Sequence, residues 1–405
     1  MAQGKRGRAS KRAPDGPATV LAFPSAAPPP RPPLTRRRRA LFLSIPFLVF
    51  FALLGAVEMA VRSRWPRVST LEAFVQAPEQ QRGFRDLHDV NVFEGDPLLF
   101  WRLAPDLPGI VWDFTPVATN SQGLRYPHPV GRKGPDVFRI ACFGDSVTFG
   151  YRVPTVWPER PKDYDPSALP FPALLEAGLR AANHGRTIEV IPMAVPGYSS
   201  HQGQAWLRRD LGWLDPDVVI ANYGWNDINL RAGTDRQTMS TSRTQVLLRR
   251  LMSHSQALTH ASRWWQSREG AAPAAVPAGG APTTRVLARE YAENMRTMAR
   301  LARGRGAHVL VLGPVYRDPV TEPAEAQRIA GHRQALRAAL AAADVPYLEI
   351  PDLHETAWPQ NEPLFGERIH PGFRGHRLMA NRLVEAMAAR GMLGGLKPPP
   401  PLPIQ

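Results

Sequence analysis

Cysteine is almost absent from this sequence of 405 residues, and Cys142 is its only example. A single thiol forms no disulfide within the chain and provides no cluster of thiolate ligands for zinc. Acidic residues are also few, with 35 Asp and Glu against 50 Lys and Arg, which gives a formal net charge of +15. Histidine and carboxylate residues form no metal-ligand cluster, so we expect neither a metal nor a cofactor.

The positive charge is concentrated at one end of the chain. Residues 1–39 contain ten Lys and Arg and only one acid, Asp15, so about +9 of the net charge lies there. This segment is also rich in proline and alanine, and we expect a disordered cytoplasmic tail. Because the remaining chain is only weakly basic, the composition argues against a nucleic-acid partner.

An apolar run follows the basic tail and extends over residues 40–61. At 1.5 Å per residue it nearly spans a hydrocarbon layer of about 30 Å, which predicts a transmembrane helix. Arg36–Arg39 precede the run, and fewer arginines follow it. This bias predicts a cytoplasmic N-terminus, with the bulk of the chain periplasmic or extracellular. A cleaved signal peptide, with Arg38-Arg39 resembling a twin-arginine signal, and a buried core helix remain alternatives.

Short apolar segments alternate with helical patterns from residue 137 to residue 390, which predicts an α/β domain with a parallel sheet covered on both faces. The expected strands are 137–143, 188–195, 217–223, 308–312 and 347–350, and the expected helices are 171–182, 202–211, 286–303, 324–343 and 372–389.

Three further regions surround or interrupt this domain. Residues 62–136 form a membrane-proximal segment with short strands and turns, in which no chemistry is apparent. The alternation is interrupted by an insertion at about 228–285, with a helical part and then an Ala/Pro/Gly linker. For its Trp264-Trp265 pair we favour packing, with a lid, a glycan contact or a membrane contact as alternatives. Residues 391–405 are a proline-rich tail that we expect to be unstructured.

Polar residues follow several of the expected strands, where a doubly wound sheet places its ligands. Ser146 can attack a carbonyl carbon if a base takes its proton, and His370 is the candidate base. Glu367, three residues earlier, can orient the imidazole. The backbone N–H groups of Ser146 and Gly197 and the amide of Asn226 can stabilise an oxyanion.

These residues resemble the four blocks of the SGNH hydrolase superfamily, the GDSL-type esterases. The blocks are a G-D-S serine, a glycine, a G-x-N-D asparagine and a D-x-x-H histidine, and they occur here in that order. The resemblance implies a flavodoxin-like three-layer α/β/α fold with a mainly parallel five-stranded sheet, and hydrolysis of esters or thioesters. It assigns the four roles to Ser146, Gly197, Asn226 and His370. The chain departs from the pattern at Glu367, where the family usually has aspartate.

The roles of other residues near these blocks are less closely defined by the sequence, and for some of them two interpretations remain. Trp225 either forms a wall of the acyl pocket or simply packs. Asp145 is expected to structure its loop rather than to catalyse. Arg285 is expected to be a solvated charge at a helix start, with an orientation toward the site as the alternative. His376 is expected to be structural.

Location and resemblance together predict a membrane-anchored, extracytoplasmic serine esterase. We expect acyl-ester substrates, among which we consider O-acetyl groups of a surface polysaccharide. A lysophospholipase or broad lipid esterase and an O-acyltransferase would use the same residues. From a different class, a non-catalytic glycan-binding envelope protein is the remaining alternative.

Overall fold

The computed structural model describes residues 35–68, 70–74, 92–154, 165–231, 233–268, 282–317 and 322–404. It divides into two units, Met1–Ala56 and Val57–Gln405. Most of the expected basic tail and of the Ala/Pro/Gly linker lies outside the described residues.

The first described helix is α1 (Arg36–Arg64), which is 29 residues long and contains Pro46. It begins at the arginines rather than at Ala40, because these side chains are good helix formers and continue the apolar helix without a break. Its most apolar 18-residue window has a mean hydropathy of 2.5, and none of that window is buried. By length and composition, α1 could be a membrane span or a signal sequence.

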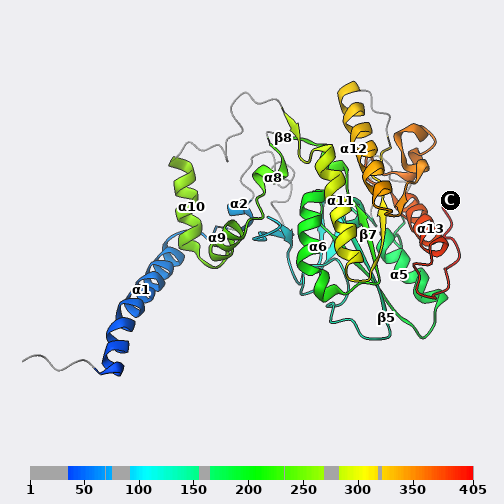
Figure 1. Ribbon diagram of the computed structural model, residues 1–405. Helices are drawn as coiled ribbons and strands as arrows, with labels where there is room; N and C mark the ends of the chain where they lie inside the picture. Colours follow the sequence, from blue (N-terminus) through cyan, green and yellow to red (C-terminus); the bar gives the residue numbers. More distant parts are fainter. Residues whose placement is uncertain are drawn as a thin grey trace, which may run out of the picture. The chain divides into compact units, whose positions relative to one another are not determined.

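A five-stranded parallel sheet forms the centre of the larger unit, as the alternating pattern predicts (Figure 1). Its strands lie in the order β11-β10-β7-β5-β6, so that the first strand along the chain lies between the second and the third. This is the strand order of the flavodoxin-like fold, and it confirms the expected fold class. The strands are β5 (Val137–Gly144), β6 (Thr187–Ala194), β7 (Val218–Asn222), β10 (His308–Leu312) and β11 (Tyr347–Leu348).

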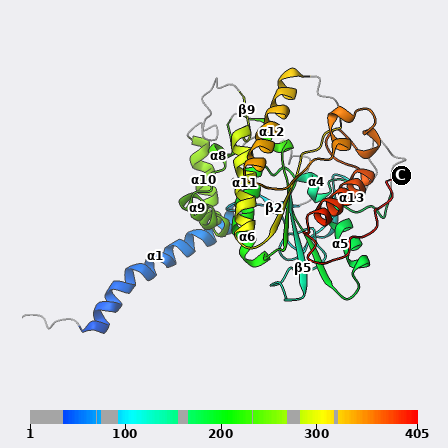
Figure 2. The ribbon, with the colours of Figure 1, turned by 45° about the vertical axis from the view of Figure 1, so that its right-hand side comes forward.

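Helices cover both faces of this sheet (Figures 1 and 2). Alternate residues of β5 enter separate apolar cores, with Ala141 and Phe143 in one and Ile140 and Cys142 in the other. Successive side chains of a strand point to opposite faces, so a strand buried on both sides is apolar throughout. The first core includes α6 (Ser200–Leu214), α11 (Ala288–Arg303) and α12 (Pro323–Ala342), and the second includes α5 (Phe171–Ala182) and α13 (Phe373–Ala389).

The segment before β5 folds as two small antiparallel pairs whose apolar side chains join the first core. The pairs are β1 (Phe93–Glu94) with β2 (Arg102–Leu103) and β3 (Pro108–Trp112) with β4 (Thr115–Ala118). The other short elements are α2 (Thr70–Phe74), α4 (Ser146–Phe149), α7 (Trp225–Ile228), α8 (Asp235–Thr238), the pair β8 (Leu230–Arg231) and β9 (Thr283–Thr284), and three 3-10 turns, Pro351–Leu353, Glu355–Ala357 and Glu362–Leu364.

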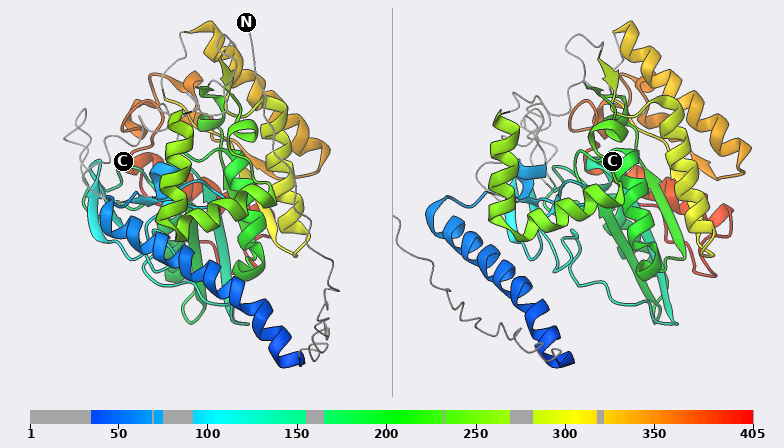
Figure 3. Two further views of the ribbon diagram at one scale, coloured as in Figure 1. Left: turned by 90° about the vertical axis from the view of Figure 1, so that its left-hand side faces the viewer. Right: turned by 60° about the vertical axis from the view of Figure 1, so that its left-hand side comes forward.

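The long helical part of the insertion, which the sequence predicts as a single region, is divided into α9 (Arg243–His254) and α10 (Gln256–Arg268). The helix ends because Ser255 adopts an extended backbone with φ −130° and ψ 115°. Both helices lie to one side of the central sheet (Figure 3).

The proline-rich C-terminal tail is packed, which corrects the expectation of an unstructured tail. The Lys397 N–H donates to the Asn183 side chain at 2.7 Å, and the Leu402 N–H donates to the Asn381 side chain at 2.8 Å. Leu396 is buried in the second core, and Leu402 packs against it. Proline provides no N–H group for regular pairing, so side-chain amides of neighbouring elements hold this extended segment.

Candidate active site

The loop after β5 places Ser146 at the start of α4. The Asp145 side chain caps this helix, accepting a hydrogen bond from the Val147 N–H at 3.0 Å. A Cβ on Gly144 would lie 2.0 Å from the Thr148 hydroxyl, so only glycine fits where the strand turns into the helix. The half-buried Ser146 side chain is therefore held at the carboxyl end of the sheet.

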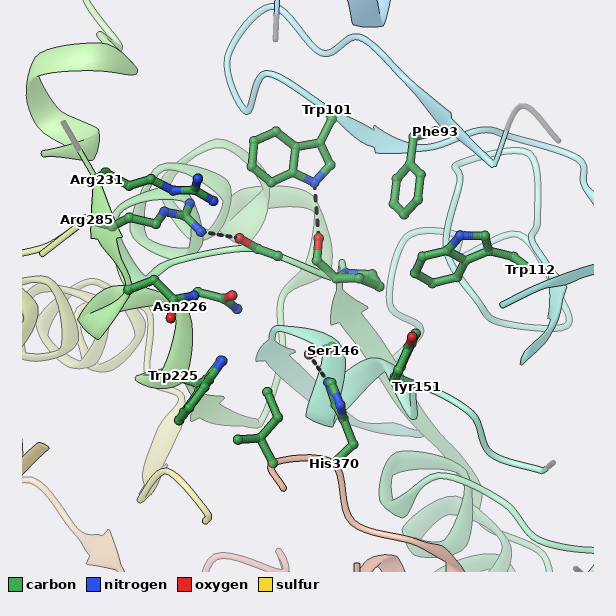
Figure 4. Close-up of a pocket in the computed structure, with 14 residues that line it drawn as sticks. Phe93, Trp101, Trp112, Ser146, Tyr151, Trp225, Asn226, Arg231, Arg285 and His370 are labelled. Carbon is green, nitrogen blue, oxygen red and sulfur yellow. Dashed lines mark hydrogen bonds between the residues drawn. The ribbon is translucent and has the colours of Figure 1, made fainter. Parts of the chain in front are cut away.

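His370 contacts both of the residues with which the sequence groups it. Its Nε2 lies 2.8 Å from Ser146 Oγ (Figure 4). Its Nδ1 forms a hydrogen bond with Glu367 Oε1. The Tyr151 ring packs on the imidazole with 4.4 Å between the centroids. The structure thus brings together a hydroxyl, an imidazole and a carboxylate in a linear arrangement.

Glu367 keeps its charge in this arrangement. Burial alone would raise the pKa of its carboxyl group, but the hydrogen bond and the charge of His370 outweigh burial. The pKa of Glu367 therefore lies below its ordinary value. An ionised carboxylate beside Nδ1 fixes a proton on that nitrogen and leaves Nε2 able to accept the serine proton.

The loop after β6 is held from two sides. Gly197 has a φ of +82°, which favours glycine. The Pro196 carbonyl accepts a hydrogen bond from Trp101 Nε1 at 3.2 Å, and the Gly197 carbonyl accepts one from Arg285 Nη1 at 2.8 Å (Figure 4).

The loop after β7 brings Asn226 to the same cavity. Its Nδ2 donates to the Tyr198 carbonyl at 3.0 Å and to Asp145 Oδ2 at 3.3 Å. Figure 4 shows the Asn226 amide facing Ser146 across the cavity. Both hydrogens of this amide therefore have acceptors in the protein, and the bond to Asp145 is the longer and weaker of the two.

Two buried carboxyl groups lie behind these loops. Burial raises the pKa of Asp145 to about 7, and the nearby charge of Asp227 raises it further against the opposing Val147 hydrogen bond. Burial also raises the pKa of Asp227 to about 6, although Ser200 donates two hydrogen bonds to it. Asp145 forms bonds within its loop and to Asn226, in agreement with the structural role expected for it.

The three loops and His370 surround a cavity of about 260 Å³. Trp225 lines it, and its ring also packs against Tyr316 with 5.5 Å between the centroids. The segment before β5 supplies three further aromatic walls, Phe93, Trp101 and Trp112.

Sequence reasoning missed this contribution of the N-terminal segment. The segment has neither a periodic pattern nor a motif, and only its aromatic content could have drawn attention to it. The expectation for Arg285 was wrong as well. Arg285 is 4% exposed, lines the cavity and forms an ion pair with Asp235 at 2.8 Å.

His376 lies outside the cavity and supports the fold. Its Nδ1 accepts a hydrogen bond from the Phe171 N–H at 3.2 Å, and burial lowers its pKa to about 3. In the described part of the chain, no group of three or more His, Cys, Asp or Glu side chains is placed to hold a metal ion.

Comparison with known proteins identifies the family. Residues 142–378, more than half of the chain, match the GDSL-like lipase/acylhydrolase family. The chain belongs to this family. It is a carboxylic ester hydrolase of the GDSL type.

Solved structures of esterases are similar at low sequence identity. An α/β hydrolase from the metagenome of Lake Arreo is 18% identical, with a TM-score of 0.40 over 63% of this chain and 96% of its own. A mutant of an acetylxylan esterase from Geobacillus stearothermophilus is 14% identical, with a TM-score of 0.40 over 64% and 95%. A lipase/acylhydrolase from Enterococcus faecalis is 17% identical, with a TM-score of 0.38 over 65% and 99%. No curated protein matched the sequence.

Proposed function

We propose that Ser146, His370 and Glu367 are the catalytic triad of an extracytoplasmic serine esterase. The contact that carries this proposal is the 2.8 Å hydrogen bond between His370 Nε2 and Ser146 Oγ, with Glu367 bonded to the opposite ring nitrogen. A non-catalytic glycan-binding protein would have no need for a hydroxyl, an imidazole and an ionised carboxylate in this order.

The reaction follows from this geometry. Ser146 Oγ attacks the ester carbonyl carbon while its proton moves to His370 Nε2. The tetrahedral intermediate collapses to an acyl-serine as His370 returns the proton to the leaving alcohol. Water, deprotonated by His370, then attacks the acyl-serine and releases the acid. Glu367 stabilises the imidazolium that forms in each step.

The oxyanion of the intermediate requires donors that are already in place. We assign this role to the N–H groups of Ser146 and Gly197 and to Asn226 Nδ2. The hydrogen bonds that hold Gly197 and Asn226 support the assignment, because donors fixed before the reaction need no reorganisation during it.

The cavity supports a short acyl group on a carbohydrate. A volume of about 260 Å³ is small for a site that would accept a long acyl chain. The indole rings of Trp112 and Trp225 provide flat apolar surfaces suited to sugar rings. None of the described insertion residues 233–268 lines the cavity, so this part of the insertion forms no lid of the kind that would favour a lysophospholipase. We therefore propose O-acetyl groups of a surface polysaccharide as substrates.

A panel of esters tests the proposed substrate. We expect acetylated oligosaccharides and acetyl esters to be hydrolysed faster than octanoyl esters or lysophospholipids, with Ser146→Ala as the inactive control. A preference for long acyl chains would overturn the carbohydrate assignment and leave the triad intact. Acyl transfer to a sugar acceptor in place of hydrolysis would identify a transferase.

We further propose that α1 anchors the protein with its N-terminus in the cytoplasm. Four arginines precede the apolar run, which supports this orientation. A reporter fused after Gln405 is expected to be active only outside the cytoplasm. Activity only inside would reverse the orientation, and a mature N-terminus beyond Ala56 would indicate a cleaved signal peptide.

A further inference from the structure

We propose that Trp101 and Arg285 are positioning residues that aim the Gly197 N–H at the oxyanion. Trp101 lies before residue 142, where the family match begins, so a segment outside the matched region would complete the catalytic machinery. This inference rests on the proposed function and specifies how one of its donors is held.

The argument starts from the planarity of the peptide bond. The Pro196 carbonyl and the Gly197 N–H belong to the same trans peptide group and point in opposite directions. A hydrogen bond that fixes the carbonyl therefore also fixes the N–H. Trp101 Nε1 donates to this carbonyl at 3.2 Å, and Trp101 is only 2% exposed.

The next peptide group is fixed from the other side. Arg285 Nη1 donates to the Gly197 carbonyl at 2.8 Å, while its Nε and Nη2 bind the Asp235 carboxylate at 3.0 and 2.8 Å. Asp235 is 1% exposed, so the guanidinium is held in a dry ion pair. With both flanking peptide groups fixed, the dihedral angles of Gly197 are determined (Figure 4).

We call the two bonds from Trp101 and Arg285 the clamp. The conformational freedom of Gly197 is the reason why such a clamp would serve the reaction. A residue without a Cβ reaches the φ of +82° found here, and it is also free to leave that conformation. An oxyanion donor is effective only when it is held in position before the charge develops. The clamp restricts the backbone dihedral angles of Gly197, which glycine alone would leave free to vary.

Trp101 is itself anchored to the loop that it supports. The Tyr198 hydroxyl donates to the Trp101 carbonyl, and the two rings pack edge to face with 5.4 Å between centroids. The Gln202 amide donates to the Leu99 carbonyl at 2.8 Å. The segment around Trp101 is therefore bound to the catalytic loop and to the helix that follows it.

Trp101→Phe tests the clamp because it keeps an aromatic ring and removes the Nε1 donor. We expect kcat to fall roughly 10- to 100-fold with little change in KM, less than the loss for deleting a donor outright. Affinity for a trifluoromethyl ketone, which forms a tetrahedral oxyanion on the serine, is expected to fall by the same factor. A kcat equal to that of the native enzyme in a folded Trp101→Phe variant would overturn the proposal.

Trp213→Phe is the matched control. Trp213 belongs to α6, packs partly buried against the first core and does not line the cavity. This variant is expected to leave both kcat and KM within about twofold. An equal loss of kcat in both variants would show a general effect of indole removal and overturn the clamp.

Arg285→Lys examines the second half of the clamp. Lysine keeps a positive charge beside Asp235, but it lacks the planar guanidinium that binds Asp235 and the Gly197 carbonyl simultaneously. We expect a lowered kcat and a retained melting temperature within a few degrees. Fluorophosphonate labelling separates this inference from the proposed function. A native enzyme that is not labelled contradicts the triad. A labelled enzyme whose kcat changes with neither Trp101→Phe nor Arg285→Lys contradicts only the clamp.

A different set of contacts carries a second inference, which concerns the insertion helices. We infer that α10 lies on the surface of an anionic bilayer beside the point where α1 leaves it. Glu58 accepts hydrogen bonds from the Gln256 N–H at 2.9 Å and the Ala257 N–H at 3.0 Å, and thus caps the first turn of α10. Glu58 lies near the C-terminal end of the apolar run, so on this inference the cap holds the start of α10 at the level of the lipid headgroups.

The linker after α1 adds further bonds to the same helix. The Val68 N–H donates to the Gln256 side chain at 2.9 Å, whose amide donates back to the Val68 carbonyl at 3.1 Å. A ring nitrogen of His260 lies 3.1 Å from the Pro66 carbonyl.

The surface of α10 suits a lipid interface. Leu258, Trp264 and Trp265 are 44%, 52% and 60% exposed, so each tryptophan of the pair presents more than half of its surface to solvent. Tryptophan is enriched at membrane–water interfaces. Residues 243–268, from the start of α9 to the end of α10, contain five arginines and no aspartate or glutamate, a charge that complements anionic headgroups.

Spin labels on the full chain in nanodiscs with phosphatidylglycerol test this inference. Leu48→Cys reports on α1, Trp265→Cys reports on α10, and Glu385→Cys, at an exposed position of α13, is the aqueous control, while native Cys142 is buried. We expect the label at position 265 to lie about 5–10 Å into the boundary of headgroups and acyl chains. A label at 265 that is as accessible to water as the one at 385 overturns the inference. A label at 48 outside the hydrocarbon would overturn the anchor and the inference together.

Discussion

Replacing Glu367 by glutamine removes the charge behind His370 and retains the shape of the side chain. The neutral amide no longer stabilises the imidazolium, and it can present its NH₂ group to Nδ1. A buried orienting carboxylate in a serine hydrolase is worth about 10⁴-fold in kcat. The Glu367 side chain is 35% exposed, so water compensates for part of the loss. We expect kcat to fall roughly 10²- to 10³-fold.

Glu367→Asp is the matched variant, because it restores the residue usual in the family and keeps the charge. The side chain becomes shorter by one carbon–carbon bond, about 1.5 Å, which breaks the contact with Nδ1 unless the loop moves. A hydrogen bond to a charged group is worth about 1.5–3 kcal/mol, so the loss without any movement is roughly 10- to 150-fold. We expect partial activity, above that of Glu367→Gln.

Initial rates on p-nitrophenyl acetate between pH 5 and 9 provide the assay, with the melting temperature of each variant as a check on folding. Native kcat in Glu367→Gln would refute the assignment of Glu367 as the orienting residue. An aspartate variant less active than the glutamine variant would show that shape, not charge, determines the role of this side chain.

Two other substitutions have clear expected outcomes. Asn226→Ala removes the one side-chain donor proposed for the oxyanion, so kcat is expected to fall roughly 10²- to 10³-fold with a nearly constant KM, and a change confined to KM in steady-state kinetics would exclude the role. Asp145→Asn tests the buried carboxyl group, whose pKa of about 7 is raised above its ordinary value. A raised pKa means that the stability this group contributes is present at low pH and is lost as pH rises toward 7. The variant is therefore expected to show a smaller fall in melting temperature between pH 5 and 8, and an unchanged pH dependence would contradict the shift.

The sheet and the proposed triad could be predicted from the sequence because their signals are local. Strands buried on both faces are continuous apolar runs, and β5 begins at Val137 as predicted. Ser146, Asn226 and His370 occur in short motifs at strand ends or next to a helix start. The parallel sheet then brings residues together that are up to 224 positions apart in the sequence, as Ser146 and His370 are.

The remaining parts of the site depend on tertiary contacts that leave no pattern in the chain. Trp101 directly precedes the two-residue strand β2, and the role proposed for it arises only from its contact with the Pro196 carbonyl. Arg285 resembles a solvated charge until Asp235, fifty residues away, is placed beside it. The C-terminal prolines were misleading for a related reason, since their order comes from the side chains of Asn183 and Asn381.

Identification of the residue that a fluorophosphonate modifies tests the central claim most directly. The native protein and Ser146→Ala are treated with the reagent and analysed by peptide mass spectrometry, together with turnover of an acetyl ester. We expect one adduct, on Ser146, and the loss of both the adduct and most of the turnover in the variant. An adduct on another residue, or native turnover without Ser146, would contradict the assignment of the active site.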